Sequence, residues 1–304
     1  DHDKYDRSKH HPVATEWETV RMISPYNGYQ NTIASLCFNQ SLHSKAPVKP
    51  LKQSRPSAKP SLEDKTYICI LMADYDSATP FYDAMPDRWD DPKRGQMPFA
   101  WGVNPNLMEA YPDLFEFFYD TATSADTFTA DASAAGYMNP NFVREDNLPL
   151  FITHNKKFYD ACDMTMSPMV LDWSEPTPAV KDAFTEFSPD GYATYLSDFH
   201  LPHPEIEQVK PHVWKGMPVM ELINSTCNFE SPEVTANLID EAIRTRGDQT
   251  PGFYFFRIVW TKPSDVIASI EKLKEKYPDR NYEVLDPYNF FRLFRESEEA
   301  KKAS

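Results

Sequence analysis

The chain has little glycine, little cysteine and no long apolar run. Only 8 of its 304 residues are glycine, whereas 27 are proline, the reverse of ordinary usage. Glycine-rich loops that cradle phosphates have almost no place in it, and neither GxGxxG nor GxxxxGK[ST] occurs. Nucleotide-dependent chemistry loses most of its support, and we expect no cofactor. No stretch approaches the ~18 apolar residues of a membrane-spanning helix, so the sequence predicts no membrane insertion.

The few cysteines lie far apart and form no CxxC pair. They are Cys37, Cys69, Cys162 and Cys227. This spacing argues against a structural zinc site and leaves the disulfide state open.

Positive charge is also scarce. The chain has 31 basic and 46 acidic residues, which gives a net charge of −15. Such a charge repels phosphate backbones and anionic lipid surfaces, so nucleic acid is excluded as a partner. Aromatic residues, in contrast, make up 14% of the chain, and they indicate a packed core because disordered chains are poor in aromatics.

Residues 1–60 differ in composition from the rest. The start is polar, and 45–60 is basic and rich in proline, which predicts an extended connector. A short helix is expected at 31–38. We interpret 1–60 as an arm, the remnant of a junction with a missing upstream domain, and 61–304 as one barrel domain.

From residue 66 onward, short apolar runs recur along the chain. Each is continuous rather than alternating, which is typical of strands buried on both faces. The eight runs lie at 66–72, 97–101, 127–130, 167–171, 193–196, 217–223, 252–259 and 281–285.

Helical patterns fall between these runs. The clearest is 232–246, where Ser231 is placed to cap the helix, Pro232 fits its first turn and Gly247 suits its exit. Further helices are expected at 112–122, 149–162, 178–187, 264–277 and 287–298. The alternation predicts an α/β fold, a (β/α)8 TIM-like barrel, with a seven-stranded or distorted barrel as the alternative.

In such a barrel, functional side chains stand where strands end and βα loops begin. Acidic and aromatic residues occupy most of these positions. Paired carboxylates divide acid and base or nucleophile roles, while aromatic rings stack on sugar rings. The candidate catalytic residues are Asp74, Asp76, Asp172 and Glu221. The candidate substrate-binding residues are Trp101, Ser133, Tyr137, Trp173, Asp198 and Trp260.

Other interpretations of these residues compete. An Asp directly after a strand is often only a helix N-cap, and a buried Glu221 needs a partner or a function. His200 and His203 would form a carboxylate–imidazole metal site with Asp74 or Asp76. The proline between the two histidines prevents a regular helical ligand pair, so we assign no metal.

Several motifs resemble one known family. Residues 133–140 (SAAGYMNP) resemble the signature of the GxGYxYP family of putative glycoside hydrolases, with Ala134 in place of its first Gly and Asn139 in place of its second Tyr. Residues 74–77 look like the family's DGDN, with Tyr75 and Ser77 at the Gly and Asn positions. Residues 94–105 and 286–291 are also similar. The resemblance covers about residues 60–295 and implies a barrel-like C-terminal domain.

These observations predict a carbohydrate-active hydrolase that cleaves glycosidic bonds of an oligo- or polysaccharide, in an extracellular or periplasmic setting. Tyr137 is expected to project towards the barrel mouth beside Asp74. One alternative is a non-catalytic glycan-binding or structural module on the same fold. Another is a metal-dependent carbohydrate hydrolase or deacetylase. Sequons at Asn39 and Asn224 permit glycosylation without requiring it.

Overall fold

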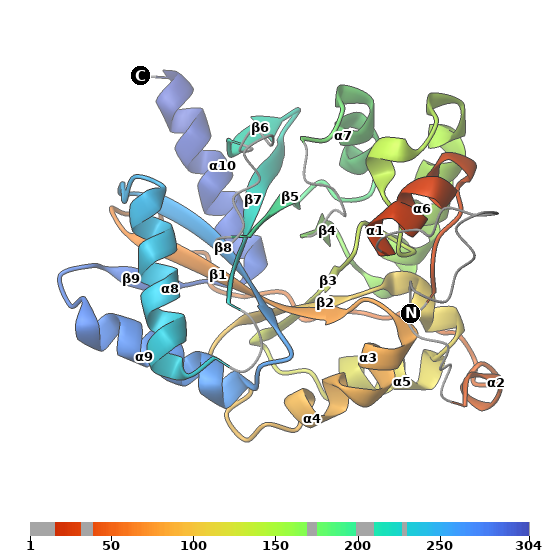
Figure 1. Cartoon of the computed structure of the whole chain (residues 1–304), viewed down its shortest axis with the longest axis horizontal. Coiled ribbons are helices and arrows are strands. Elements are labelled where there is room, and N and C mark those ends of the chain that lie inside the picture. The colour runs from red at the N-terminus through yellow and green to blue at the C-terminus, as the bar shows by residue number, and fades with distance from the viewer. Residues whose placement is uncertain (1–15, 32–38, 169–174, 199–209, 227–229, 304) are drawn as a thin grey trace, which may run out of the picture.

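The computed structural model describes residues 16–31, 39–168, 175–198, 210–226 and 230–303. A parallel sheet curls into a nearly closed barrel with helices around it (Figure 1). The strands are β1 (Thr66–Tyr75), β2 (Phe99–Val103), β3 (Asp126–Ala130), β4 (Met166–Ser167), β5 (Gly191–Asp198), β6 (His212–Trp214), β7 (Met217–Thr226), β8 (Gly252–Val259) and β9 (Tyr282–Val284). None of the helices in these ranges is long and apolar enough to cross a membrane.

Seven strands form the barrel, in the order β3-β2-β1-β8-β7-β5-β4. β8 pairs with β1 along its whole length, from Gly252 with Thr66 to Val259 with Ala73. The end strands β3 and β4 lie near each other, but no strand pairing joins them within the described residues. The barrel therefore has one seam.

The seven-stranded alternative holds because the eighth predicted strand stays outside the ring. Residues 281–285 give β9, which pairs with Thr66–Ile68 at the start of β1. From Leu71 onward, β1 pairs with β2 instead. Since β8 takes the other edge of β1 throughout, β9 and β2 share one edge and only β2 continues the barrel.

The helices surround the barrel, as the sequence predicts. Ser231 does cap α8, since its Oγ accepts the Val234 N–H at 3.3 Å. α8 packs against both α9 and β7. The helices are α1 (Glu16–Ile23), α2 (Gln40–His43), α3 (Ala78–Asp83), α4 (Met85–Trp89), α5 (Pro112–Asp120), α6 (Leu148–Cys162), α7 (Pro178–Thr185), α8 (Pro232–Thr245), α9 (Pro263–Lys276) and α10 (Pro287–Ala303).

The first turns of α10 close the end of the barrel where the strands begin. The Phe290 ring lies 5.7 Å from Phe253 and 5.9 Å from Phe255, both in β8. Phe291 presses against the first residue of β5, because a Cβ on Gly191 would lie only 2.6 Å from its ring. The opposite end, where the strands terminate, is thereby left as the mouth.

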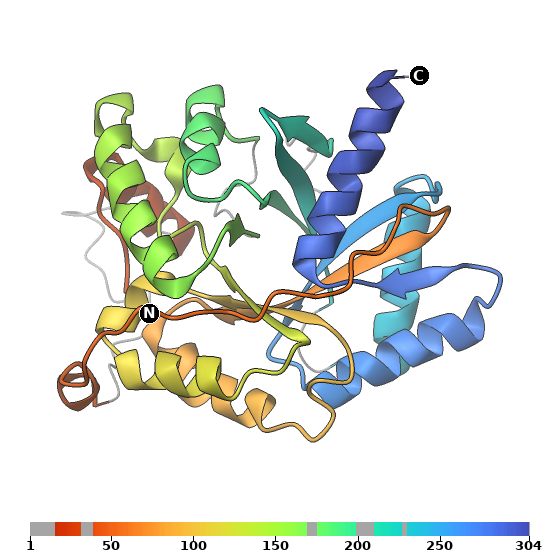
Figure 2. The same cartoon turned by 180° about the vertical axis from the view of Figure 1, so that it is seen from behind.

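An extended arm before β1 crosses the outside of the barrel (Figure 2). The Leu51 N–H donates to the Ala161 carbonyl at 2.7 Å, at the end of α6. Gln53 hydrogen-bonds the unpaired edge of β3, because its Nε2 donates to the Phe128 carbonyl at 3.0 Å and its Oε1 accepts the Phe128 N–H at 2.6 Å. Arg292 of α10 then donates to the Pro60 carbonyl at 2.8 Å. A side-chain amide thus takes the place of a strand at the seam.

Two cysteines belong to the core. Cys69 and Cys162 are buried free thiols, and burial raises the pKa of each well above its usual value. Cys37 and Cys227 lie outside the described residues.

Candidate functional site

Three neighbouring strands bring charged groups together at the mouth. Asp74 is the second-last residue of β1, and its carboxylate forms an ion pair with the Arg257 guanidinium of β8. Arg257 also donates to the Asn224 side-chain oxygen of β7 at 2.9 Å. Burial lowers the pKa of Arg257, but the charges of Asp74, Asp131 and Asp76 raise it by more. The pKa is therefore above its usual value, and the guanidinium is charged.

Asp131 supplies a second carboxyl group beside Asp74. It is fully buried, and its Oδ2 accepts the Asp74 N–H at 3.0 Å while its Oδ1 accepts the Ala132 N–H at 2.8 Å. Burial and then the Asp74 charge raise its pKa to about 6, against the opposing effect of Arg257. Gly102 of β2 makes room for it, because a Cβ there would lie 2.4 Å from Asp131 Oδ2.

The backbone around these carboxyl groups is strained. Positive φ angles occur at Asp74 (67°), Trp260 (48°) and the run Ala132, Ser133 and Ala134 (52°, 82° and 106°). Each non-glycine residue of this kind costs of order 1–3 kcal/mol, and such residues cluster at functional sites. Here they mark the ends of β1, β8 and β3.

Asp76 and Trp260 lie near Asp74, as the sequence predicts for residues of one rim. The Trp260 indole N–H donates to the Asp74 carbonyl at 2.9 Å, and its ring is partly exposed. Asp76 is buried, and its charge acts on Arg257. Asp74 itself remains 26% exposed, which makes it the most accessible carboxylate of this group.

The signature segment, residues 133–140, lies under Tyr29 and Gln30 of the N-terminal arm rather than open to the mouth. Tyr137 is buried, and its backbone forms a two-way bridge with Gln30, at 2.9 and 3.2 Å. A Cβ on Gly136 would lie 2.5 Å from the Tyr29 ring, so glycine is required for this close approach. Ser133 is also fully buried. The structure therefore does not leave a ring face of Tyr137 for a ligand.

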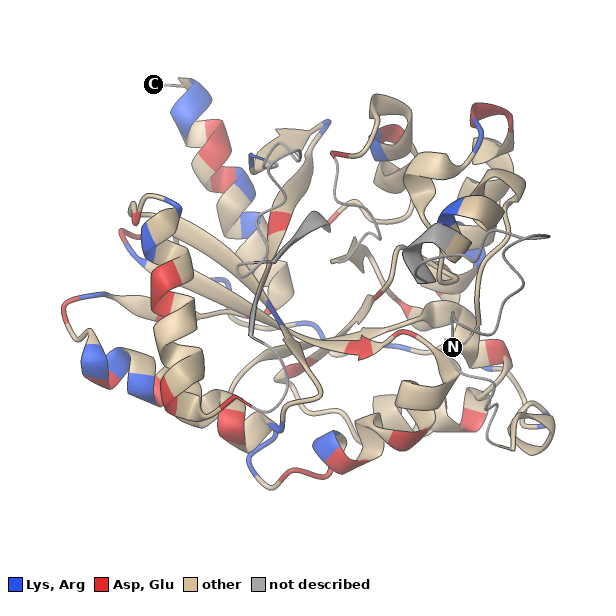
Figure 3. Cartoon of the chain, viewed as in Figure 1, with Lys and Arg blue, Asp and Glu red and all other residues tan. Residues whose placement is uncertain are grey.

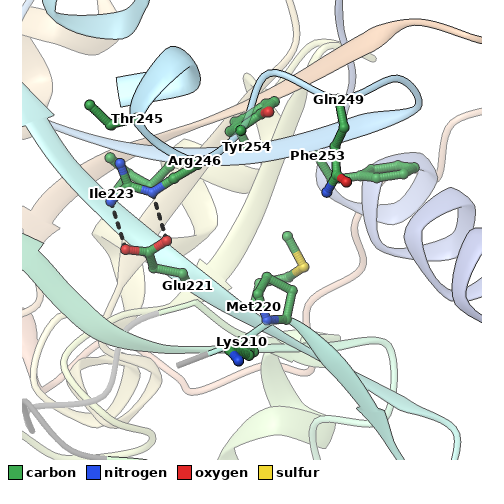
Figure 4. A pocket seen from close by; sticks show the side chains of 11 residues that line it. Lys210, Met220, Glu221, Ile223, Thr245, Arg246, Gln249, Phe253 and Tyr254 are labelled. Atoms are coloured by element: carbon green, nitrogen blue, oxygen red, sulfur yellow. Dashed lines mark hydrogen bonds and ion pairs between the residues drawn. The ribbon is translucent and has the colours of Figure 1, made fainter. Parts of the chain in front are cut away.

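Trp101 and Glu221 do not join the group at the mouth. Trp101 is fully buried, 5.1 Å from the Trp89 ring of α4, and its indole N–H donates to Asp126 at 2.8 Å. Glu221 points towards Arg246, which binds both of its oxygens at 2.7 Å (Figure 4). The buried Glu221 thus has the partner that its position requires.

The Glu221 pair lines a cavity of about 430 Å³. The cavity lies where β7 and β8 diverge, because they pair only from Leu222 with Phe255 onward, whereas the start of β7 pairs with β6. It is therefore separate from the mouth.

Several sequence candidates cannot be placed. Asp172 and Trp173 lie outside the described residues, as do His200 and His203. Asp198 ends β5 with its backbone opposite Asn224, and nothing is described of its side chain.

The described part of the chain contains no group of three or more His, Cys, Asp or Glu residues arranged to hold a metal ion. Arg257 is instead the cation that lies against Asp74.

Asp131 and Arg257 are absent from the sequence-based candidates. Each has a signal in the sequence: Asp131 follows a predicted strand just as Asp74 does, and Arg257 interrupts the apolar run 252–259. A cation inside a strand buried on both faces needs an anionic partner, and in the structure that partner is Asp74.

The fold and mouth define an α/β-barrel protein with a charged site at the strand ends. Residues 64–295 match the family model described as GxGYxYP putative glycoside hydrolase C-terminal domain. The chain belongs to this family, which confirms the resemblance of its motifs. No curated protein matches its sequence.

A solved structure shares the fold. A putative hydrolase from Bacteroides thetaiotaomicron VPI-5482 aligns with a TM-score of 0.71 at 18% identity, over 92% of this chain and 55% of its own. The chain thus spans about half the length of that protein. A putative polysaccharide deacetylase from Mycobacterium smegmatis aligns at a TM-score of 0.49 and 15% identity, over 83% of this chain and 96% of its own.

Proposed function

We propose that the mouth hydrolyses a glycosidic bond of an oligo- or polysaccharide, with Asp74 as the carboxylate that meets the substrate. The observation that carries this proposal is the coupling of two carboxyl groups, Asp74 and Asp131, with Arg257 at the mouth. Membership of a family described as glycoside hydrolases supports the reaction class.

The roles of Asp74 and Asp131 follow from their accessibility, and the role of Asp76 follows from its place in the chain directly after the end of β1. Asp74 is partly exposed and ion-paired, so it is suited to stabilise positive charge that develops on the sugar ring. Asp76, two residues further along, would give its proton to the leaving oxygen as the glycosidic C–O bond breaks. A water molecule would then bond the sugar carbon through its oxygen and return a proton to Asp76. Asp131 is fully buried, so it would act as a positioning residue that holds the Asp74 backbone and sets the local charge.

Other side chains at the same strand ends would orient the sugar. The Ser77 Oγ and the Asn104 Nδ2 are buried without a hydrogen-bond partner in the described part of the chain. Buried polar groups are nearly always bonded, so these atoms would bind water molecules that bridge to the sugar hydroxyls. The partly exposed Trp260 ring would stack on the sugar.

The test is release of reducing ends from a panel of soluble oligosaccharides. Asp74→Asn should lower the rate about 10²- to 10⁴-fold, with oligosaccharide binding nearly unchanged. Asp279→Asn, an exposed acid of α9–β9, is the matched control and should keep full activity. Asp76→Asn should lose activity as well, and an unchanged melting temperature of each variant would exclude a folding defect.

Non-catalytic glycan binding is the second candidate, and the Arg257 ion pair favours it because that pair neutralises Asp74. If the wild-type chain binds oligosaccharides but releases neither reducing ends nor acetate, the hydrolase proposal is wrong and the binding function stands. Release of acetate without reducing ends would instead indicate a deacetylase.

A further inference from the structure

A basic hollow lies at the barrel end opposite the mouth. It has a volume of about 200 Å³ and joins the arm to the start of α10. Its charged and aromatic lining consists of Arg55, Lys59, Asp190, Tyr288, Arg292 and Arg295. Asp190 directly precedes β5, which places the hollow where the strands begin.

Four cations around one carboxylate are unusual in a chain with a net charge of −15. Acidic and basic residues are otherwise mixed over the helices, α10 included (Figure 3). Asp163 compensates Arg55, and Glu296 compensates Arg292. Within the described residues, Lys59 and Arg295 form no ion pair. Like charges that line one hollow repel each other, and a bound anion would offset that repulsion.

Two of the guanidinium groups are held in place. Arg55 stacks 4.4 Å from the Tyr288 ring centre, and its Nη2 donates to the Asp163 carbonyl at 3.0 Å. Arg292 donates to the Pro60 carbonyl at 2.8 Å and to the Asn289 side chain at 3.0 Å. Their positions are therefore set before any ligand arrives, which lowers the entropy cost of binding.

Donors remain for a ligand. Arg55 bonds the described residues through Nη2 alone, so its Nε and Nη1 have no hydrogen-bond partner among them. Arg295 makes one long bond there, from Nη1 to the Gly216 carbonyl at 3.4 Å, and Lys59 makes none. Guanidinium and ammonium donors of this kind bind carboxylate, sulfate and phosphate oxygens most strongly.

We propose that the basic hollow binds an oxyanion through Lys59, Arg295 and the open side of Arg55. The anion is either the acidic group of a sugar, such as a uronate, or a free inorganic anion. Asp190 distinguishes the two sources. Its carboxylate accepts the Thr165 hydroxyl at 2.7 Å and would accept a sugar hydroxyl beside the acidic group, whereas it only repels a free anion. This site is independent of the hydrolysis proposed at the mouth.

The experiment is calorimetric titration of the full chain, in a low-salt buffer without phosphate. The probes are inorganic phosphate, glucuronate and, as the neutral control, glucose. We expect at least one anion to bind and glucose not to bind. Lys59→Gln combined with Arg295→Gln should weaken anion binding about tenfold or more. The matched control is Lys274→Gln with Lys302→Gln, two exposed lysines that form no ion pair within the described residues, and it should bind as the wild type does.

Asp190→Asn separates the sources. Weaker glucuronate binding with stronger phosphate binding would identify an acidic sugar, and stronger binding of both would identify a free anion. The inference is wrong if neither anion binds, if glucose binds equally well, if both double variants behave alike, or if Asp190→Asn changes nothing. Asp74→Asn should bind the anions as the wild type does, which separates this site from the mouth.

Discussion

At the scale of single residues, Asp131 has the clearest consequence. Folding raises the pKa of its carboxyl from 3.8 to about 6, so the folded state favours the protonated form. The stability that protonated Asp131 contributes is therefore fully present below about pH 4 and is lost as the pH rises through about 6. The loss is up to about 3 kcal/mol, since each pKa unit corresponds to about 1.4 kcal/mol.

Asp131→Asn removes this dependence. Compared with the variant, the wild type should lose up to about 3 kcal/mol of unfolding free energy between about pH 4 and pH 7. Urea unfolding at both pH values measures it, with Asp279→Asn as the control for an exposed acid. If the unfolding free energies of the wild type and Asp131→Asn differ by the same amount at both pH values, the pKa of Asp131 is not raised by folding.

Ala134 carries strain that glycine would relieve. Its φ of 106° is disfavoured for any residue with a Cβ, and the family signature has glycine at this position. We expect Ala134→Gly to raise the unfolding free energy by about 1 kcal/mol, because relief of strain exceeds the extra entropy of the unfolded chain.

The neighbouring Ala135 provides the control for this substitution. It is equally buried but does not have a positive φ. Ala135→Gly should therefore lower stability by about 0.5–1 kcal/mol. Thermal or urea unfolding compares the two, and a loss of stability in both variants would show that Ala134 is not strained.

At the scale of elements, the arm supplies what β3 lacks. The Gln53 amide satisfies both the N–H and the carbonyl of Phe128 at the unpaired edge of β3. Gln53→Ala leaves both groups without these partners, so we expect a loss of about 1–3 kcal/mol in urea unfolding.

Two further variants make this test specific. Gln53→Glu keeps an acceptor for the Phe128 N–H but lacks the donor for its carbonyl, so its loss should be intermediate. Ser54→Ala, at the exposed next position, should have little effect. A Gln53→Ala variant as stable as Ser54→Ala would mean that the arm does not stabilise β3.

Elements were predictable where local pattern decides them. The run 252–259 became β8, and the cap at Ser231 begins α8. Contacts distant in sequence were not predictable: nothing near Gln53 indicates Phe128. Trp101 shows a second limit, because a strand buried on both faces gives no alternation to tell which side chain faces the mouth. For the same reason Glu221 could not be assigned to Arg246 in advance.

At the scale of the whole molecule, the seam should be the least stable line of the barrel. Ile68, Cys69 and Ile70 lie in the central strand β1, paired with β8. Among the described residues, the Phe128 N–H donates only to the Gln53 side chain of the arm. Hydrogen exchange should therefore be faster at Phe128 than at the three β1 amides, and faster still in Gln53→Ala. Equal protection at both places would show that the seam opens only on global unfolding.

The seam also bears on the diameter of the barrel. In a closed barrel, strand number and shear fix the diameter, and any widening must break hydrogen bonds between strands. Here the ring is interrupted between β3 and β4 in the described residues. Small rotations between adjacent strands can then widen or narrow the mouth while every ladder stays intact. We expect a ring of this kind to adjust to ligands of different width at its mouth without loss of strand pairing.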